Sequence, residues 1–188
     1  MKNLKTIAIA LFVAAASISV NAQTKKIDVK ASTIKWVGKK VTGEHSGTVN
    51  FKDGAVVLKG KKLVGGSFTV DMTSLTSTDL TGEYQGKLNG HLKADDFFGT
   101  DKFPTSTLVI KKINTKAKDL YTVTADLTIK GITKPINFEL AVKGNTATTA
   151  FKVDRTKYDI KYGSGNFFQG LGDKTINDDF ELAVALKF

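Results

Sequence analysis

Apolar and polar residues alternate with a period of two along much of this chain, and this pattern limits its fold more than any other feature. Between Tyr121 and Lys130, apolar residues occupy every second position, and Thr, Asp or Lys lie between them. Side chains of a β-strand point alternately to its two faces, so the pattern indicates strands with one apolar face and one polar face. The same alternation occurs at 45–51, 66–72, 136–142 and 180–188.

Short turn signals separate these segments. Asp53-Gly54 predicts a hairpin turn, the stretch from Gly131 to Pro135 predicts another, and Lys143-Gly144-Asn145 predicts a third. About eight strand segments joined in this way predict an all-β antiparallel barrel or sandwich. A βαβ fold would need long amphipathic helices between its strands.

One region departs from the alternation. Tyr84, Leu88 and Leu92 recur every four residues after Thr81, which predicts a short amphipathic helix with Thr81 as its N-cap. The acidic and aromatic residues at 95–98 predict a second helical turn. We expect this helical insert to lie against the barrel.

The N-terminal segment predicts export. Two lysines precede an apolar run from Ile7 to Ala16, and small residues then lead to Ala22. The run is too short for a membrane-spanning helix, and the segment is typical of a cleaved signal peptide. We therefore expect a signal peptide at 1–22 and one domain at 23–188.

The formal net charge of +10 is spread along the chain. It indicates solubility and weak, transient attraction to anionic membrane surfaces, with recognition of a phosphate head group as an alternative. Nucleic acid is not expected as a partner, because the lysines are scattered and no arginine-rich or aromatic-basic motif occurs.

Catalytic and metal sites are not expected. His45 and His91 are the only histidines, cysteine is absent, and no H-E-x-x-H motif occurs. Gly163-Ser164-Gly165 lacks the G-x-S-x-G pattern of a nucleophile elbow, and the sequence from Gly170 to Thr175 lacks the spacing of a P-loop.

Five short motifs, in order along the chain, resemble the YceI-like family. They are Trp36 with His45-Ser46-Gly47 and Phe51; Gly66-Ser67-Phe68 with Asp71-Met72; Gly90-His91-Leu92-Lys93 with Asp95-Asp96-Phe97-Phe98 and Phe103-Pro104; Asp126 to Gly131 with Thr133 and Pro135; and Asp154-Arg155 with Tyr158 and Tyr162 to Gly165. The resemblance implies an extended, eight-stranded antiparallel barrel of the lipocalin type with a helical insert. It also implies non-enzymatic binding, transport or storage of a polyisoprenoid or quinone-like lipid in a periplasmic tunnel, without a cofactor.

The apolar strand faces supply candidate residues for the tunnel. We expect it to be lined by Trp36, Val49, Phe51, Phe68, Val70, Leu108, Ile110, Leu127, Ile129, Phe138, Phe151 and Leu182, with Phe97, Phe98, Phe167 and Phe168 near an opening. For each of these residues, ordinary packing in the core is the alternative, because strand patterns do not distinguish a hollow barrel from a packed one.

Three polar residues are candidate contacts for a polar ligand end. His45 is in phase with Val49 and Phe51 and could point into the barrel, although a hydrogen-bonded core histidine is the alternative. Asp154 and Arg155 could orient a head group or form an ordinary ion pair at the rim. The glycine-rich segment from Tyr162 to Gly172 is a mobile gate or a plain connecting loop.

Other functions are also compatible with the sequence. A final alternating strand ending in Phe188 is typical of a transmembrane outer-membrane barrel, although the chain has only four tyrosines and one tryptophan for two membrane girdles. A lipid-modifying enzyme could use the same barrel, and the sequence does not exclude a homodimer.

Overall fold

The computed structural model describes residues 22–188. These residues form nine strands, one α-helix and two short 3-10 helices, in the order β1 (Ala22–Lys26), β2 (Thr33–Lys40), β3 (Gly43–Lys59), β4 (Lys62–Ser77), α1 (Gly82–Lys93), β5 (Thr105–Ala117), β6 (Leu120–Ile129), β7 (Ile132–Lys143), β8 (Thr146–Asp154), η1 (Arg155–Tyr158), η2 (Gly172–Lys174) and β9 (Ile176–Lys187). The predicted signal peptide lies outside the described residues, except for Ala22. Within them, no helix is long and apolar enough to cross a membrane.

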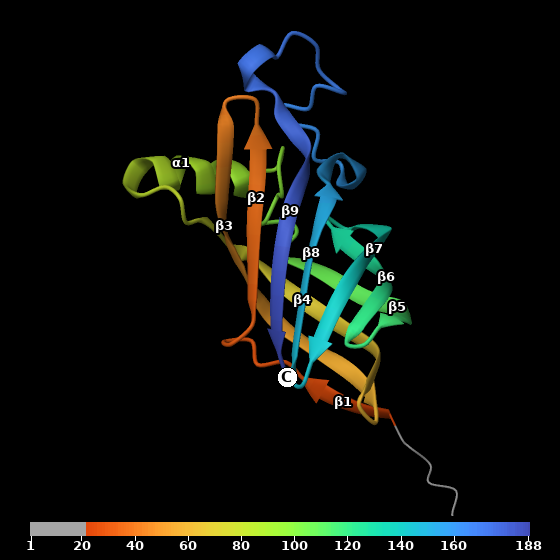
Figure 1. The fold of residues 1–188 in the computed structure, drawn as a ribbon. Helices are drawn as coiled ribbons and strands as arrows, with labels where there is room; N and C mark the ends of the chain where they lie inside the picture. Colours follow the sequence, from red (N-terminus) through yellow and green to blue (C-terminus); the bar gives the residue numbers. More distant parts are fainter. Residues whose placement is uncertain (1–21) are drawn as a thin grey trace, which may run out of the picture.

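Strands β2 to β9 form a closed antiparallel barrel (Figure 1). The order is β3-β2-β9-β8-β7-β6-β5-β4, and pairing of β3 with β4 closes the ring. The last strand, β9, lies between β2 and β8. The predicted eight-stranded barrel with one short helix is therefore confirmed, and β1 is an additional strand paired with β3.

Strand β3 is longer than the alternation predicted. Its first half pairs with β2 and its second half with β1, and the chain reverses only after Lys59. The predicted turn at Asp53-Gly54 is therefore wrong. The strand continues through these two residues, and a β-bulge lies just before them, between Phe51 and Asp53. A Cβ on Gly54 would stand 2.7 Å from the Phe68 ring. Glycine at this position permits close packing inside a strand.

The turn predicted between Gly131 and Pro135 is shorter than expected. Lys130 and Gly131 form the two-residue turn, with φ values of 49° and 72°, and Pro135 lies inside β7. Two consecutive residues with positive φ suit a tight hairpin. Pro135 is tolerated because this part of β7 is not paired with β8, so a missing N–H costs no ladder bond. The turn at Gly144-Asn145 agrees with the prediction.

Strands β7 and β8 separate soon after their hairpin. Only Ala141, Val142 and Lys143 of β7 pair with β8, and the strands diverge beyond them (Figure 1). The short helix η1 follows β8 and packs against both β7 and β9. Tyr158 and Ile160, at its end, are almost completely buried. We call the region between the diverging strands, filled by η1, Tyr158 and Ile160, the β7–β8 seam.

Helix α1 confirms the predicted helical insert, with two differences. Thr81 precedes the helix, but its side chain makes no capping hydrogen bond. Of the expected apolar face, Leu92 is buried whereas Tyr84 is 73% exposed. Residues 95–98 form a series of turns rather than a helix, since Phe97 and Gly99 both donate their N–H groups to the carbonyl of Ala94.

Candidate ligand-binding cavity

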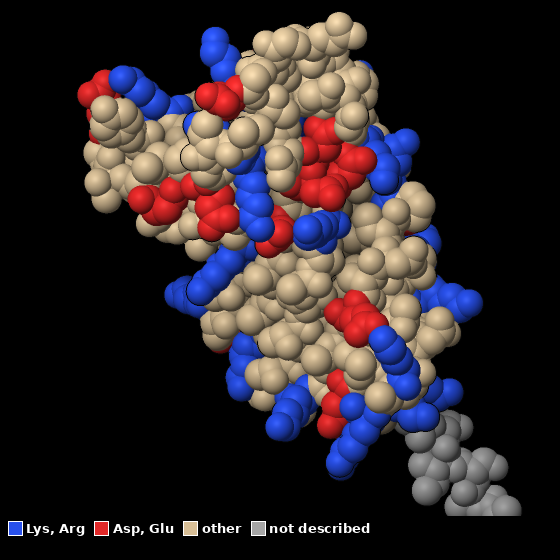
Figure 2. Space-filling model, turned by 45° about the horizontal axis from the view of Figure 1, so that its top comes forward, with Lys and Arg blue, Asp and Glu red and all other residues tan. Residues whose placement is uncertain are grey.

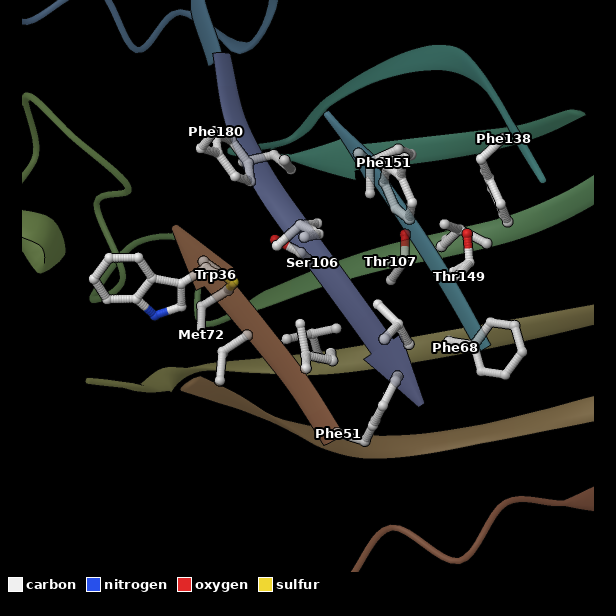
Figure 3. Close-up of a pocket in the computed structure, with 18 of the residues that line it drawn as sticks. Trp36, Phe51, Phe68, Met72, Ser106, Thr107, Phe138, Thr149, Phe151 and Phe180 are labelled. Atoms are coloured by element: carbon white, nitrogen blue, oxygen red, sulfur yellow. The ribbon is translucent and has the colours of Figure 1, made fainter. Parts of the chain in front are cut away.

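The apolar faces of the strands enclose a cavity inside the barrel. Its volume is about 180 Å³, and its walls are almost entirely apolar (Figure 3). A cavity of roughly 150 Å³ lined by Leu, Ile and Phe is large enough to bind benzene. The barrel is therefore hollow, and its interior suits an apolar molecule.

The structure brings most of the predicted lining residues together. The predicted residues that line the cavity are Trp36, Val49, Phe51, Phe68, Val70, Phe97, Phe98, Leu108, Ile110, Leu127, Ile129, Phe138, Phe151 and Leu182. Phe167 and Phe168 are not part of the lining and are each about half exposed. Ligand contact by any of these residues stays a prediction.

Several lining residues were not among the candidates. Ile34 precedes Trp36 on the inward face of β2, and Phe180, Val184 and Leu186 share the inward face of β9 with Leu182. Their alternation could have identified them. Other lining residues are polar, namely Ser106, Thr107, Thr149, Asn177 and Asp179. No pattern in the sequence distinguishes these side chains from outward-facing Ser, Thr, Asn and Asp.

Aromatic pairs shape the cavity walls. Phe138 of β7 and Phe151 of β8 stack with ring centroids 4.8 Å apart, across the point where these strands diverge. Phe51 and Phe68 face each other at 6.2 Å from neighbouring strands. In Figure 3, Trp36 and the Phe138–Phe151 pair lie on opposite sides of the cavity. Flat rings of this kind offer broad apolar surfaces to a chain-like ligand.

Arg155 is the charged side chain most deeply buried at the cavity. Its guanidinium donates hydrogen bonds to the carbonyl groups of Ile160, Ile176 and Asn177, at 2.7 to 3.0 Å. It also lies 3.6 Å from Asp178 and 5.7 Å from the centre of the Phe97 ring.

Burial lowers the pKa of Arg155, and the nearby carboxylates oppose that shift. Arginine nevertheless stays charged in proteins. Most of its donors are already occupied by backbone carbonyls, so Arg155 primarily fastens η1 to β9.

Asp154 does not line the cavity. Its carboxylate accepts hydrogen bonds from the N–H and the hydroxyl of Thr156, at 3.0 and 2.6 Å, and so caps η1. It also lies 3.5 Å from Lys157. The predicted contact between Asp154 and a ligand is therefore not supported by its position.

His45 also lies away from the cavity. It has the inward phase of its strand and pairs with Gly38, which lines the cavity, but His45 itself is not part of the lining. Its Nδ1 atom is 2.8 Å from Asp79, and its side chain is 34% exposed. The other histidine, His91, packs against the rings of Phe97 and Tyr162. Within residues 22–188, no three potential metal ligands cluster.

Asp79 links β3 to the segment before α1. It accepts hydrogen bonds from the Ser46 N–H and the Ser77 hydroxyl, both at 3.0 Å, besides its contact with His45. Burial raises the pKa of this carboxyl, but the hydrogen bonds outweigh that effect and lower the pKa from 3.8 to about 2. The ionised carboxylate therefore stabilises the folded state above pH 3.8, and this contribution is lost as the pH falls towards 2.

We expect Asp79→Asn to lower the free energy of unfolding by about 1 kcal/mol at neutral pH, allowing for solvent screening of a partly exposed group. The difference from the wild type should shrink as the pH falls towards 2. Urea denaturation across this pH range measures both effects. Asp101→Asn, in an exposed turn, is the control. A difference that is constant with pH would show that the charge of Asp79 is not responsible.

A closed antiparallel barrel around an apolar cavity defines the class of this protein, which is a lipocalin-like barrel. Residues 25–188 match the family model of the YceI-like domain. The chain therefore belongs to the YceI-like family.

Curated relatives match part of the chain. A UPF0312 protein of Photorhabdus laumondii is 31% identical over 97 residues, which cover 50% of each chain. A UPF0312 protein of Staphylococcus aureus is 34% identical over 109 residues, which cover 53% of this chain and 60% of the relative. The chain thus spans about half the length of the curated relatives it matches.

Solved structures show the same fold at low sequence identity. BcnA of Burkholderia cenocepacia is 21% identical, with a TM-score of 0.67 over 85% of this chain and 98% of BcnA. A polyisoprenoid binding domain from Saccharophagus degradans is 16% identical, with a TM-score of 0.57 over 86% and 95%. The YceI protein of Campylobacter jejuni is 17% identical, with a TM-score of 0.55 over 100% and 90%.

Proposed function

We propose that this protein binds a long apolar lipid of the polyisoprenoid type in its barrel and carries or stores it in the periplasm without altering it. The observation that carries the proposal is the apolar cavity, which extends between Trp36, the Phe51–Phe68 pair and the Phe138–Phe151 pair. Family membership and the fold shared with a polyisoprenoid binding domain add support.

One buried hydroxyl at the cavity wall without a hydrogen-bond partner favours a ligand that has a hydrogen-bonding atom. The hydroxyl of Ser106 is buried at the cavity wall and has no hydrogen-bond partner among the described residues. Leaving a buried hydroxyl without a partner costs about 1–3 kcal/mol. A ligand oxygen near Ser106 would remove that cost, so a prenylated quinone or phenol fits the cavity as well as a pure hydrocarbon chain.

The outward strand faces disfavour a transmembrane barrel. Along β6 and β7 these faces carry Thr122, Thr124, Asp126, Asn137 and Glu139. A barrel that crosses a membrane has the opposite arrangement, with apolar residues facing the lipid. These outer faces suit water, which agrees with a soluble periplasmic carrier.

Native mass spectrometry of the protein purified from its periplasm tests the proposal, together with lipid analysis of an organic extract. We expect one prenyl lipid per barrel, recovered intact. Trp36 is the only tryptophan and lines the cavity, so a short prenylated quinone should quench its fluorescence on binding. An empty protein that shows no quenching would contradict the proposal, and a chemically altered lipid would favour an enzyme.

A further inference from the structure

The loop between η1 and β9 forms a closed, uncharged projection. The Ile176 N–H donates to the Gly163 carbonyl at 2.8 Å and closes the base of the loop. Every residue from 162 to 172 is uncharged, in a chain of which 24% is charged. Phe167 and Phe168 are 51% and 49% exposed, although both are large apolar side chains. Exposed aromatic pairs of this kind mark interaction sites.

The tip of the β2–β3 hairpin extends this apolar surface. The Val41 N–H donates to the Thr175 carbonyl at 3.2 Å, which attaches the hairpin to the loop. Val41 itself is 65% exposed. Figure 1 places the loop and the hairpin at the same end of the barrel. We call the surface made by residues 162–172 and Val41 the apolar tip.

A continuous chain of aromatic rings connects the apolar tip to the cavity. Tyr162, at the base of the loop, contacts His91 with ring centroids 4.5 Å apart, and His91 contacts Phe97 at 5.3 Å. Phe97 then contacts Phe98 at 5.3 Å, and Phe98 contacts Phe180 at 6.1 Å. Phe97, Phe98 and Phe180 line the cavity, whereas Tyr162 is 46% exposed. Contacting rings therefore connect the cavity wall to the base of the apolar tip.

Lysines flank the apolar tip. The Lys161 ammonium lies 5.2 Å from the centre of the Phe167 ring and 2.9 Å from Asp159. Lys40 and Lys174 are exposed beside the hairpin and the loop, and so are the acidic residues Glu44 and Asp173. Figure 2 shows mostly uncharged surface at the upper end of the molecule, with acidic as well as basic side chains below it. An uncharged apolar tip on a chain with a formal net charge of +10 suits an anionic bilayer, where the acyl chains lie beneath anionic head groups.

We propose that the apolar tip docks on an anionic lipid bilayer, with Phe167 and Phe168 inserted at the boundary between head groups and acyl chains. This inference rests on the proposed function, because a bilayer is the source or the destination of an apolar lipid. The net charge favours an anionic bilayer over a second copy of the chain. A contact between two tips would bring two chains of the same net positive charge together.

Flotation with phospholipid vesicles tests the docking. We expect the wild type to bind vesicles of phosphatidylcholine with phosphatidylglycerol more tightly than vesicles of phosphatidylcholine alone, and high salt to remove the difference. The double variant Phe167→Ser, Phe168→Ser should lose at least about tenfold in vesicle affinity, because both inserted rings are absent. Lys161→Gln with Lys174→Gln should weaken binding to the anionic vesicles only.

Tyr84→Ser is the matched control. Tyr84 is also an exposed aromatic residue with a lysine beside it, since the Lys87 ammonium lies 5.9 Å from its ring centre. It belongs to α1, which projects from the side of the barrel in Figure 1. Its removal should leave vesicle binding unchanged, and circular dichroism should show that all variants are folded.

The docking and the proposed function fail in different ways. A wild type that contains prenyl lipid but does not bind vesicles, or a double variant that binds them as the wild type does, would overturn the docking alone. A protein that binds vesicles through Phe167 and Phe168 but stays empty would overturn the proposed function alone. Self-association lost in the double variant, without vesicle binding, would assign the tip to a second copy and overturn the docking.

Discussion

Gly38→Phe is expected to reduce the affinity for a prenyl ligand about tenfold to a hundredfold, through partial filling of the cavity. Gly38 lines the cavity, and a Cβ built on it would meet no atom within 4 Å. Its φ is not in the left-handed region, so a phenylalanine fits the strand without strain. The phenylalanine ring would displace about one isoprene unit of the ligand, whose burial contributes roughly 4 kcal/mol to the free energy of binding. Apolar contacts between the new ring and the rest of the ligand would restore part of this free energy.

Titration with a prenylated quinone, followed by Trp36 fluorescence, measures this effect. Thr33→Phe is the matched control, because Thr33 lies on the exposed face of the same strand. We expect the control to bind as the wild type does, and both variants to retain the melting temperature. Unchanged affinity in Gly38→Phe would mean that the ligand does not occupy this part of the cavity.

Arg155→Leu is expected to lower the free energy of unfolding by about 3–5 kcal/mol, and the melting temperature by about 10 °C or more. The substitution leaves the carbonyls of Ile160, Ile176 and Asn177 without their shared donor. It also leaves the Asp178 carboxylate, 18% exposed, without its cationic neighbour. The fastening of η1 to β9 is thereby lost, and the β7–β8 seam should open first.

Two further variants separate the role of Arg155 from a general effect of charge. Lys157→Leu removes an exposed partner of Asp154 and should cost less than about 1 kcal/mol. Arg155→Lys keeps the charge but not the planar set of hydrogen-bond donors. Its free energy of unfolding should therefore lie between those of the wild type and Arg155→Leu. Thermal unfolding followed by circular dichroism measures all three, and a loss below about 1 kcal/mol in Arg155→Leu would contradict this account.

Hydrogen exchange would localise the change. Tyr158 fills the seam, and burial, with a smaller contribution from Asp154, raises the pKa of its hydroxyl to about 12. In Arg155→Leu, faster amide exchange should appear first in η1 and in the flanking part of β8, because Arg155 no longer fastens η1 to β9.

Much of the barrel could be predicted from local pattern alone. Alternation identified which side chains of β6, β7 and β9 share an apolar face, because the period of a strand places every second residue on one side. The helix at α1 followed from its four-residue spacing in the same way. The turns were less predictable. Asp53-Gly54 has the composition of a turn, yet the strand continues through it, because Asp53 and Gly54 pair with Thr69 and Phe68 of β4.

The polar candidates show where local pattern is insufficient. His45 has the phase of an inward residue, but phase does not reveal that its side chain contacts Asp79 and is not part of the cavity lining. Asp154 and Arg155 are adjacent, yet one caps η1 at the seam and the other is buried among three carbonyls. The Ser106 hydroxyl lies at the cavity wall, where it has no hydrogen-bond partner among the described residues. Each of these outcomes depends on residues distant in sequence.

The sequence by itself determined that this protein is an all-β chain whose strands turn an apolar face inward, since the period of the side chains requires nothing beyond the strand. Only the tertiary structure decided that the interior is hollow. The number of strands and their stagger set the width of a barrel, and side chains of given size either fill that width or leave a cavity. The β7–β8 seam and the aromatic connection to the apolar tip likewise exist only once distant strands have come together.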